Sequence, residues 1–226
     1  MRRRVAGIDE AGRGPLAGPV VAAAVILRPG RRIDGIADSK VLSPDERSAL
    51  NVIIRRDALC FGIGWADRAE IDALNILQAT FLAMRRALLA MSMTPDHVLV
   101  DGDRLPYLGG LGKTLTARAI VGGDATQPAI SAASILAKTA RDSYMNHMDT
   151  LYPAYSFATH KGYCTPDHQR LLGLHGPCPL HRRSFAPVRF ALGLEPSLGP
   201  EPPLGLEPAL GLEPALGLEP ALGLAP

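Results

Sequence analysis

The segment GIDEAGRGPLAGPVVAAAVIL (residues 7–27) carries the clearest structural signal in this sequence. Its apolar runs predict two strands, Arg4–Asp9 and Pro19–Leu27, on either side of a glycine-rich turn. Asp9 and Glu10 are consecutive, and consecutive strand residues point to opposite faces of a sheet. We therefore expect the two carboxylates to share one site only if the strand ends or bends at the following turn, Ala11–Gly14.

Strand-like and helix-like segments alternate over the next part of the chain. Ser43, Pro44 and Glu46 form the start signal of a helix, with a cap, a proline at the first helical position and a capping box. Further strands are predicted at Leu59–Trp65, Val98–Val100 and Thr114–Val121, and further helices at Asp67–Leu88, from Ser131 to about Leu151, and from Thr165. This alternation predicts an α/β domain.

Two more acids follow predicted strands. Asp101 ends the apolar run LVDGD, and Asp124 follows the predicted fifth strand in GGD. Three strand ends that each deliver an acid indicate a site at the edge of a sheet. Two unit charges about 4 Å apart repel by roughly 4 kcal/mol at an effective dielectric near 20, so such acids must take up protons or bind cations.

Four carboxylates are a typical ligand set for hard cations. Oxygen ligands favour Mg²⁺ or Mn²⁺ over Zn²⁺. Two such ions about 3.5–4 Å apart can activate a water on one side of a phosphate and stabilise the leaving oxygen on the other. The alternative for each acid alone is an ordinary turn cap or a solvated loop acid, but the set in this order favours a metal site.

Charge and cysteine content restrict the class of protein. The net charge is +2 over 226 residues, but no Lys or Arg follows Arg189, whereas five of the 22 acidic residues do. The body therefore has 24 basic and 17 acidic residues, a charge of +7, which suits a nucleic-acid partner although many soluble proteins are as basic. Three irregularly spaced cysteines argue against a disulfide framework and a zinc site. No segment has the length of a membrane span or the pattern of a signal peptide, so we expect a cytoplasmic protein with no membrane partner.

The end of the chain is a separate segment. Residues 191–226 are dominated by a near six-residue Leu-Gly-Leu-Glu-Pro-Ala repeat, in which proline prevents a continuous helix and leucine is too sparse to build a core. We expect a disordered tail after a catalytic domain of residues 1–190, with a partner-binding tail as the alternative.

Seven blocks together closely resemble the ribonuclease HII family, in the family's order and over nearly all of residues 4–190. The blocks are residues 7–27, DSKVLS (38–43), EIDALNILQATFLAMRRAL (70–88), LVDGD (99–103), GDATQPAISAASILAKTARD (123–142), HKGYCTPDH (160–168) and HRRSFAPV (181–188). The resemblance implies a ribonuclease H-like fold: a central mixed five-stranded sheet flanked by helices, with a helical C-terminal part.

The same resemblance implies a metal-dependent endonuclease that cuts the RNA strand of RNA–DNA hybrids. It also implies cutting at single ribonucleotides in duplex DNA, with 5′-phosphate and 3′-hydroxyl ends. It assigns two divalent ions, Mn²⁺ or Mg²⁺, to Asp9, Glu10, Asp101 and Asp124. We expect a monomer; a replication-clamp partner cannot be read from the sequence.

Substrate contacts are implied as well. Backbone groups of Gly12, Arg13 and Gly14 are expected to meet the ribose 2′-hydroxyl, the group that distinguishes RNA from DNA, and Tyr163 to pack on the sugar at an RNA-to-DNA junction. Candidates for phosphate contacts, each of which alone is more typical of a solvated side chain, are Arg13, Lys40, Lys138 and Lys161.

Some positions depart from the family pattern or compete for a role. Gly122 stands where the family has lysine, Val41 replaces a second lysine, and Cys164 replaces a glycine whose loss could restrict the backbone beside Tyr163. Asp103 and Asp142 are rivals for the fourth metal ligand, although Asp142 fits a salt-bridging helix residue better. Capping and packing explain His160, His168 and His181 better than catalysis does.

Two other functions compete with the nuclease. A hybrid-binding module without catalysis is disfavoured by the intact acids. An unrelated phosphate-handling enzyme is disfavoured because GRGPLAG matches neither a P-loop nor a dinucleotide-binding fingerprint.

Overall fold

The computed structural model describes residues 3–36, 42–112 and 114–194. Lys40, Val41 and most of the predicted tail lie outside these residues. Within them, no helix is both long and apolar enough to cross a membrane.

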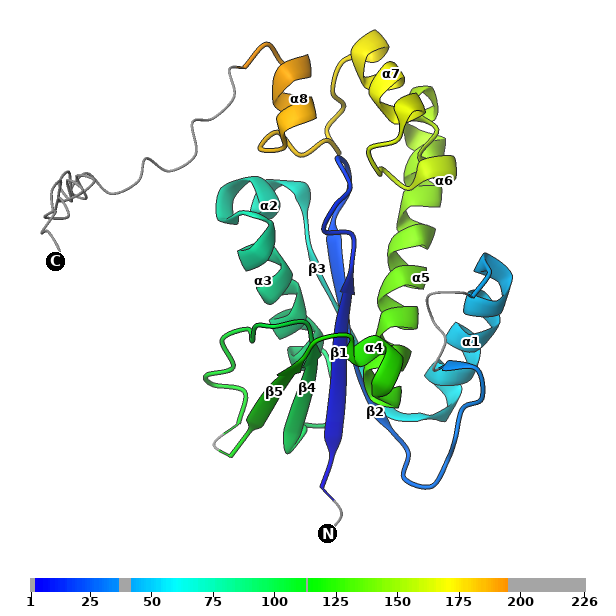
Figure 1. Cartoon of the computed structure of the whole chain (residues 1–226), viewed down its shortest axis with the longest axis vertical. Helices are drawn as coiled ribbons and strands as arrows, with labels where there is room; N and C mark the ends of the chain where they lie inside the picture. The colour runs from blue at the N-terminus through cyan, green and yellow to red at the C-terminus, as the bar shows by residue number, and fades with distance from the viewer. Residues whose placement is uncertain (1–2, 37–41, 113, 195–226) are drawn as a thin grey trace, which may run out of the picture. The chain divides into compact units, whose positions relative to one another are not determined.

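A mixed five-stranded sheet forms the centre of the domain (Figure 1). The strands are β1 (Val5–Ala11), β2 (Val20–Leu27), β3 (Ala58–Ala66), β4 (His97–Asp101) and β5 (Thr116–Ile120). Their order is β3-β2-β1-β4-β5; β1, β2 and β3 are antiparallel neighbours, whereas β4 and β5 run parallel to β1. This confirms the expected mixed sheet, and it places the C-terminal ends of β1 and β4 side by side.

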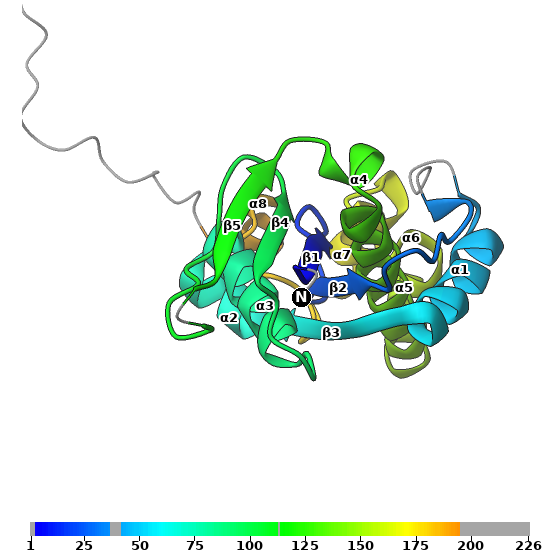
Figure 2. The same cartoon turned by 90° about the horizontal axis from the view of Figure 1, so that it is seen from below.

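Helices cover both faces of this sheet. The α-helices of the described residues are α1 (Pro44–Asp57), α2 (Arg68–Leu74), α3 (Ile76–Leu89), α4 (Gly123–Thr126), α5 (Pro128–Leu151), α6 (Phe157–His160), α7 (Pro166–His175) and α8 (Ala186–Ala191). The helices α2 and α3 lie on one face, and α1 and α5 on the other (Figure 2). Ala22 and Ala24 of β2 pack with the α3 side, while Ala23 and Val25 pack with the α5 side, which explains why β2 is apolar throughout.

Three local expectations are wrong. The first strand does not end at the acids, because β1 continues to Ala11 and pairs there with Val21 of β2. The interruption lies on the other side, where the pairing of β1 with β4 ends at Ile8 and Val100, so Asp9 and Glu10 lie beyond that ladder. β1 therefore ends two residues later than predicted, at the start of the turn Ala11–Gly14, and its pairing with β4 already stops before the acids.

The other two errors concern helices. The segment expected to be one helix from Asp67 is two, because Asn75 adopts a positive φ of 71° and its side chain accepts from the Gln78 N–H to cap α3. The helix expected from Ser131 begins at Pro128, a residue suited to the first helical turn.

A close approach between α5 and β1 positions the site. A Cβ on Gly7 would lie only 2.2 Å from the carbonyl carbon of Ala129 and 2.3 Å from the nitrogen of Ile130. Glycine therefore lets the first turn of α5 rest directly on the strand. Asp9 follows Gly7 by two residues and so faces the same helix.

Candidate active site

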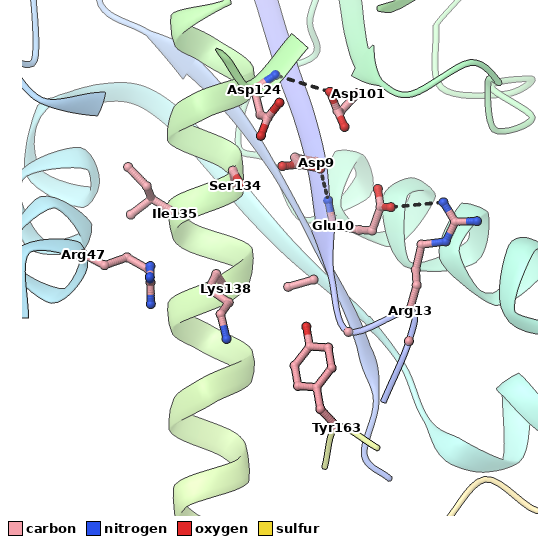
Figure 3. A pocket seen from close by; sticks show the side chains of 13 residues that line it. Asp9, Glu10, Arg13, Arg47, Asp101, Asp124, Ser134, Ile135, Lys138 and Tyr163 are labelled. Atoms are coloured by element: carbon pink, nitrogen blue, oxygen red, sulfur yellow. Dashed lines mark hydrogen bonds and ion pairs between the residues drawn. The ribbon is translucent and has the colours of Figure 1, made fainter. Parts of the chain in front are cut away.

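The four predicted acids line a single cleft of about 470 Å³ (Figure 3). They come from three segments: Asp9 and Glu10 from β1, Asp101 from the end of β4, and Asp124 from α4. The remaining lining residues are Ala11, Gly12, Arg13, Gly14, Arg47, Ser134, Ile135, Lys138 and Tyr163. The structure thus brings together acids that are up to 115 positions apart in the sequence, from Asp9 to Asp124.

Backbone geometry fixes the direction of each acid. The Asp9 side chain points towards α5, whereas the Glu10 side chain points towards Arg13, whose Nη1 lies 3.4 Å from Glu10 Oε1 (Figure 3). The Asp9 carboxylate also accepts from the Glu10 N–H at 2.7 Å. The Asp124 N–H donates to Asp101 Oδ1 at 3.3 Å, which ties the start of α4 to the end of β4.

Burial and mutual repulsion raise the pKa values of the two central acids. Asp9 is 6% exposed, and its pKa lies well above the usual value because of desolvation first and the charge of Glu10 second; a hydrogen bond from Ser134 and the neighbouring charge of Asp101 act in opposite directions. Desolvation also raises the pKa of Glu10, against the lowering effect of Arg13. Burial therefore disfavours the ionised forms of these two acids when the cleft holds no cation.

This donor set fits a hard divalent cation. All four groups offer carboxylate oxygen, which is the ligand that hard divalent cations prefer. As they lie, no three acid, histidine or cysteine side chains among the described residues are close enough to one another to hold a metal ion.

The predicted substrate-binding residues are not all brought to the cleft. Gly12, Arg13, Gly14, Lys138 and Tyr163 line it. The Lys161 side chain does not, because its ammonium group instead bonds Asn146 Oδ1 at 2.5 Å and the Ala158 carbonyl. The position of Lys161 therefore lends no support to the expected phosphate contact, and Lys40 lies in the part of the chain that is not described.

The rival acids have other partners. Asp142 accepts from Lys138 Nζ at 2.5 Å and lies 3.9 Å from Arg47, so it is the salt-bridging helix residue that the sequence favoured. Asp103 is 79% exposed at its side chain, and it faces Arg104 at 3.8 Å outside the main cleft. Cys164 does not take a positive φ, so its backbone accommodates a side chain without the expected restriction.

Sequence reasoning missed Ser134 and Arg47. Ser134 bonds Asp9, and it belongs to a polar stripe on α5 in which Ser131, Ser134, Lys138 and Arg141 recur at three- and four-residue spacing. That spacing was a readable signal for a helix face turned towards polar chemistry. Arg47 reaches the cleft from α1, and no local pattern distinguishes it from a solvated arginine.

The buried histidines form a hydrogen-bonded chain behind Tyr163. His181 Nδ1 accepts from the Cys178 N–H at 3.0 Å, so its Nε2–H donates to His168 Nε2 at 3.0 Å. His168 Nδ1–H then donates to the Tyr163 carbonyl at 2.8 Å. The first bond requires an unprotonated Nδ1 on His181 and the second an unprotonated Nε2 on His168, so both imidazoles are neutral, which agrees with the expected structural role.

The hydrogen-bonded pair of His168 and His181 makes the free energy of unfolding depend on pH. Burial first and the neighbouring His168 second lower the pKa of His181 from 6.5 to about 4. At this residue the unfolded chain therefore binds more protons between these pH values, and the contribution of His181 to the free energy of unfolding should fall by on the order of 2 kcal/mol from pH 7 to pH 4.5, whereas the raised pKa values of Asp9 and Glu10 act in the opposite direction.

Urea unfolding at pH 7 and at pH 4.5 measures this effect. The buried Asp57, whose pKa is lowered to about 2 by Arg56, loses its contribution only below this window. His181→Gln should be less stable at pH 7 and lose less stability on acidification. A variant with the full wild-type pH dependence would refute the assignment.

Comparisons with known proteins agree with this geometry. The family profile described as Ribonuclease HII matches residues 6–188. The chain belongs to the ribonuclease HII family. Ribonuclease HII of Polaromonas sp. is 58% identical over 184 residues, which cover 81% of this chain and 90% of the relative. Ribonuclease HII of Bordetella pertussis is 56% identical over 185 residues, which cover 82% and 90%.

Solved structures show the same architecture. The crystal structure of ribonuclease H2 from Pyrococcus horikoshii matches with a TM-score of 0.71 and 28% identity, over 83% of this chain and 96% of that one. Bst-RNase HIII in complex with Mn²⁺ shares the fold at a TM-score of 0.66 and 17% identity, over 84% and 70%. The ribonuclease H-like fold and the ribonuclease H activity on RNA–DNA hybrids implied by the sequence are thereby confirmed.

Proposed function

We propose that this ribonuclease HII cuts both RNA–DNA hybrids and duplex DNA that contains a single ribonucleotide, leaving 5′-phosphate and 3′-hydroxyl ends. The observation that carries the proposal is the convergence of four acids with Tyr163 and the Gly12–Gly14 turn on one cleft. The acids supply the hydrolytic half of the site, and the turn and the tyrosine supply the half that recognises the substrate.

Asp9, Glu10, Asp101 and Asp124 would hold two divalent ions, Mn²⁺ or Mg²⁺. When bound, such ions activate a water and stabilise the oxygen that leaves. The protein's own contribution is to orient the acids: Ser134 and the Glu10 N–H bond Asp9, and Arg13 lies 3.4 Å from Glu10. Mn²⁺ in the distant HIII structure agrees with this choice of ion.

Recognition would depend on the ribose. Tyr163 is 41% exposed at the cleft, with Lys138 Nζ 5.9 Å and Arg141 Cζ 5.6 Å from its ring centre. Two cations near one ring favour a nearby phosphate, and the exposed ring edge is free to pack on a sugar. Gly14 has open space where a Cβ would project, so the substrate backbone can approach this turn closely.

Cleavage of a DNA duplex carrying one ribonucleotide tests the proposal. With Mg²⁺ or Mn²⁺, the wild-type protein should cut on the 5′ or 3′ side of that residue with a 5′-phosphate product, and should leave the all-DNA duplex intact. Tyr163→Ala should reduce this cleavage rate by about 10–100-fold, equivalent to roughly 1.4–2.7 kcal/mol, and weaken duplex binding much less.

Two results would count against the proposal. Binding of the ribonucleotide-containing duplex without cutting under either ion would favour a hybrid-binding module. Equal losses of binding and cleavage in Tyr163→Ala would remove the packing role of the tyrosine. Tyr152→Ala, a change at a half-buried tyrosine outside the cleft, is the matched control and should cut normally.

A further inference from the structure

Two arginines are fully buried behind the recognition half of the cleft. Arg141 of α5 and Arg182 of the loop before α8 are each 0% exposed. Among the described residues, neither forms an ion pair with a carboxylate. A buried charge without a counter-charge is costly, and a neutral side chain could fill the same space. The burial of these two guanidinium groups therefore indicates a specific role for their charge or their hydrogen bonds.

Arg182 is bonded to the backbone on both sides of the glycine-rich turn. Its Nη1 donates to the Arg13 carbonyl at 2.8 Å, and its Nη2 donates to the Gly12 carbonyl at 2.5 Å and the Pro19 carbonyl at 3.2 Å. Its Nε donates to the Gly18 carbonyl at 2.9 Å. One planar side chain thus fixes four carbonyl groups of the segment from residue 12 to residue 19.

Arg141 joins this segment to the loop that carries the tyrosine. Its Nε donates to the Pro19 carbonyl at 3.1 Å, and its Nη2 donates both to the Ala17 carbonyl at 3.1 Å and to the Lys161 carbonyl at 3.0 Å. Its Nη1 has no hydrogen-bond partner among the described residues, and the guanidinium carbon lies 5.6 Å from the centre of the Tyr163 ring.

The shape of the turn depends on the same guanidinium groups. Gly12 has a φ of +96°, and a Cβ there would lie 2.1 Å from Arg141 Nε and 2.4 Å from its Cδ. Glycine at this position therefore allows the arginine to pass directly beneath the turn. The two loops also contact each other, because the Leu16 N–H donates to the Gly162 carbonyl at 2.8 Å.

We propose that Arg141 and Arg182 are positioning residues that hold the Gly12–Gly14 turn and Tyr163 in the one relative arrangement that distinguishes a ribonucleotide from a deoxyribonucleotide. This inference rests on the proposed function, in which the turn and the tyrosine contact the ribose. The arginines do not touch the substrate; they act through the carbonyl groups they bind. Their charge also makes the surroundings of the turn attractive to a phosphodiester.

Paired affinity measurements test the inference. In an Asp9→Asn background, which prevents cutting, fluorescence anisotropy with Mg²⁺ gives the dissociation constants for an RNA–DNA hybrid and for a DNA duplex of the same sequence. Arg182→Met should reduce the preference for the hybrid at least tenfold and change DNA affinity much less. Arg182→Lys, which keeps the charge but cannot bond four carbonyls, should also lose most of the preference.

Controls separate the possible outcomes. Arg183→Met changes the exposed neighbouring arginine and should keep the wild-type ratio. If Arg182→Met does not fold, judged by circular dichroism, Arg182→Lys decides. A folded Arg182→Lys with an unchanged ratio, or with equal losses for hybrid and DNA, overturns the inference. If Asp9→Asn alone shows no preference for the hybrid, then the proposed recognition of the ribose by the turn and Tyr163 is wrong, and the role of the arginines is not the cause.

Discussion

Asp9→Asn should reduce hybrid cleavage by at least about 10³-fold, about 4 kcal/mol of transition-state stabilisation, while hybrid affinity changes by less than threefold. The substitution removes one negative charge from the centre of the acid cluster and leaves every basic residue of the cleft in place. Steady-state cleavage and anisotropy binding measure the two quantities. Asp103→Asn, at an exposed acid outside the main cleft, is the matched control and should cut like wild type.

The same variant should be more stable without metal. The pKa of Asp9 is raised in the folded state, so folding is opposed by its ionised form at neutral pH and this penalty disappears only when the group is protonated. Asn removes the penalty, so the metal-free variant should unfold at a higher urea concentration than wild type. Near-wild-type turnover, or a metal-free variant less stable than wild type, would contradict the role of Asp9.

Gly7→Ala should disrupt the packing of α5 on the sheet. Its Cβ would lie 2.2 Å from a backbone carbon of Ala129, whereas ordinary contact begins near 3.4 Å, so α5 must retreat from β1. Overpacking of this kind costs about 3 kcal/mol, and it also moves Ser134 away from Asp9. We expect urea unfolding to show this loss, and cleavage by the remaining folded protein to fall at least tenfold.

Gly173→Ala provides the comparison for that experiment. Gly173 lies inside α7 with no atom within 4 Å of an added Cβ, so alanine there should be neutral or should stabilise by up to about 1 kcal/mol. If Gly7→Ala were as stable and as active as Gly173→Ala, the close approach of α5 to β1 would not be what positions the site.

The sheet and the acids could be predicted because their signals are local. Apolar runs of β-branched residues and alanine marked the strands, and Asp9, Asp101 and Asp124 each follow such a run. The way in which Asp9 and Glu10 share the cleft could not be predicted. It depends on where β4 stops pairing with β1, which is a property of two segments about 90 residues apart.

The residues that hold the site in place could not be predicted from the sequence either. Asn75 divides α2 from α3 through a positive φ that its side chain makes tolerable, and nothing in the apolar periodicity of the segment marks the break. Arg141 and Arg182 look like surface residues in a sequence, because arginine is seldom fully buried. Their burial follows from carbonyl groups that only the folded loop presents.

Gly122 stands where the family pattern has lysine, and its backbone conformation shows what this difference changes. It takes the left-handed conformation, with φ of 65°, directly before α4 and two residues before Asp124. Glycine adopts this conformation without strain, and a Cβ there would meet open space. The positive φ would nevertheless strain any other side chain, so a lysine at this position would alter the local backbone as well as the charge near the acids.

Anomalous diffraction from crystals of the wild-type protein soaked in Mn²⁺ tests the central claim most directly. Two manganese peaks are expected in the cleft, with Asp9, Glu10, Asp101 and Asp124 as the protein ligands. Manganese bound elsewhere, or bound in the cleft without Asp9 and Asp101, would contradict it.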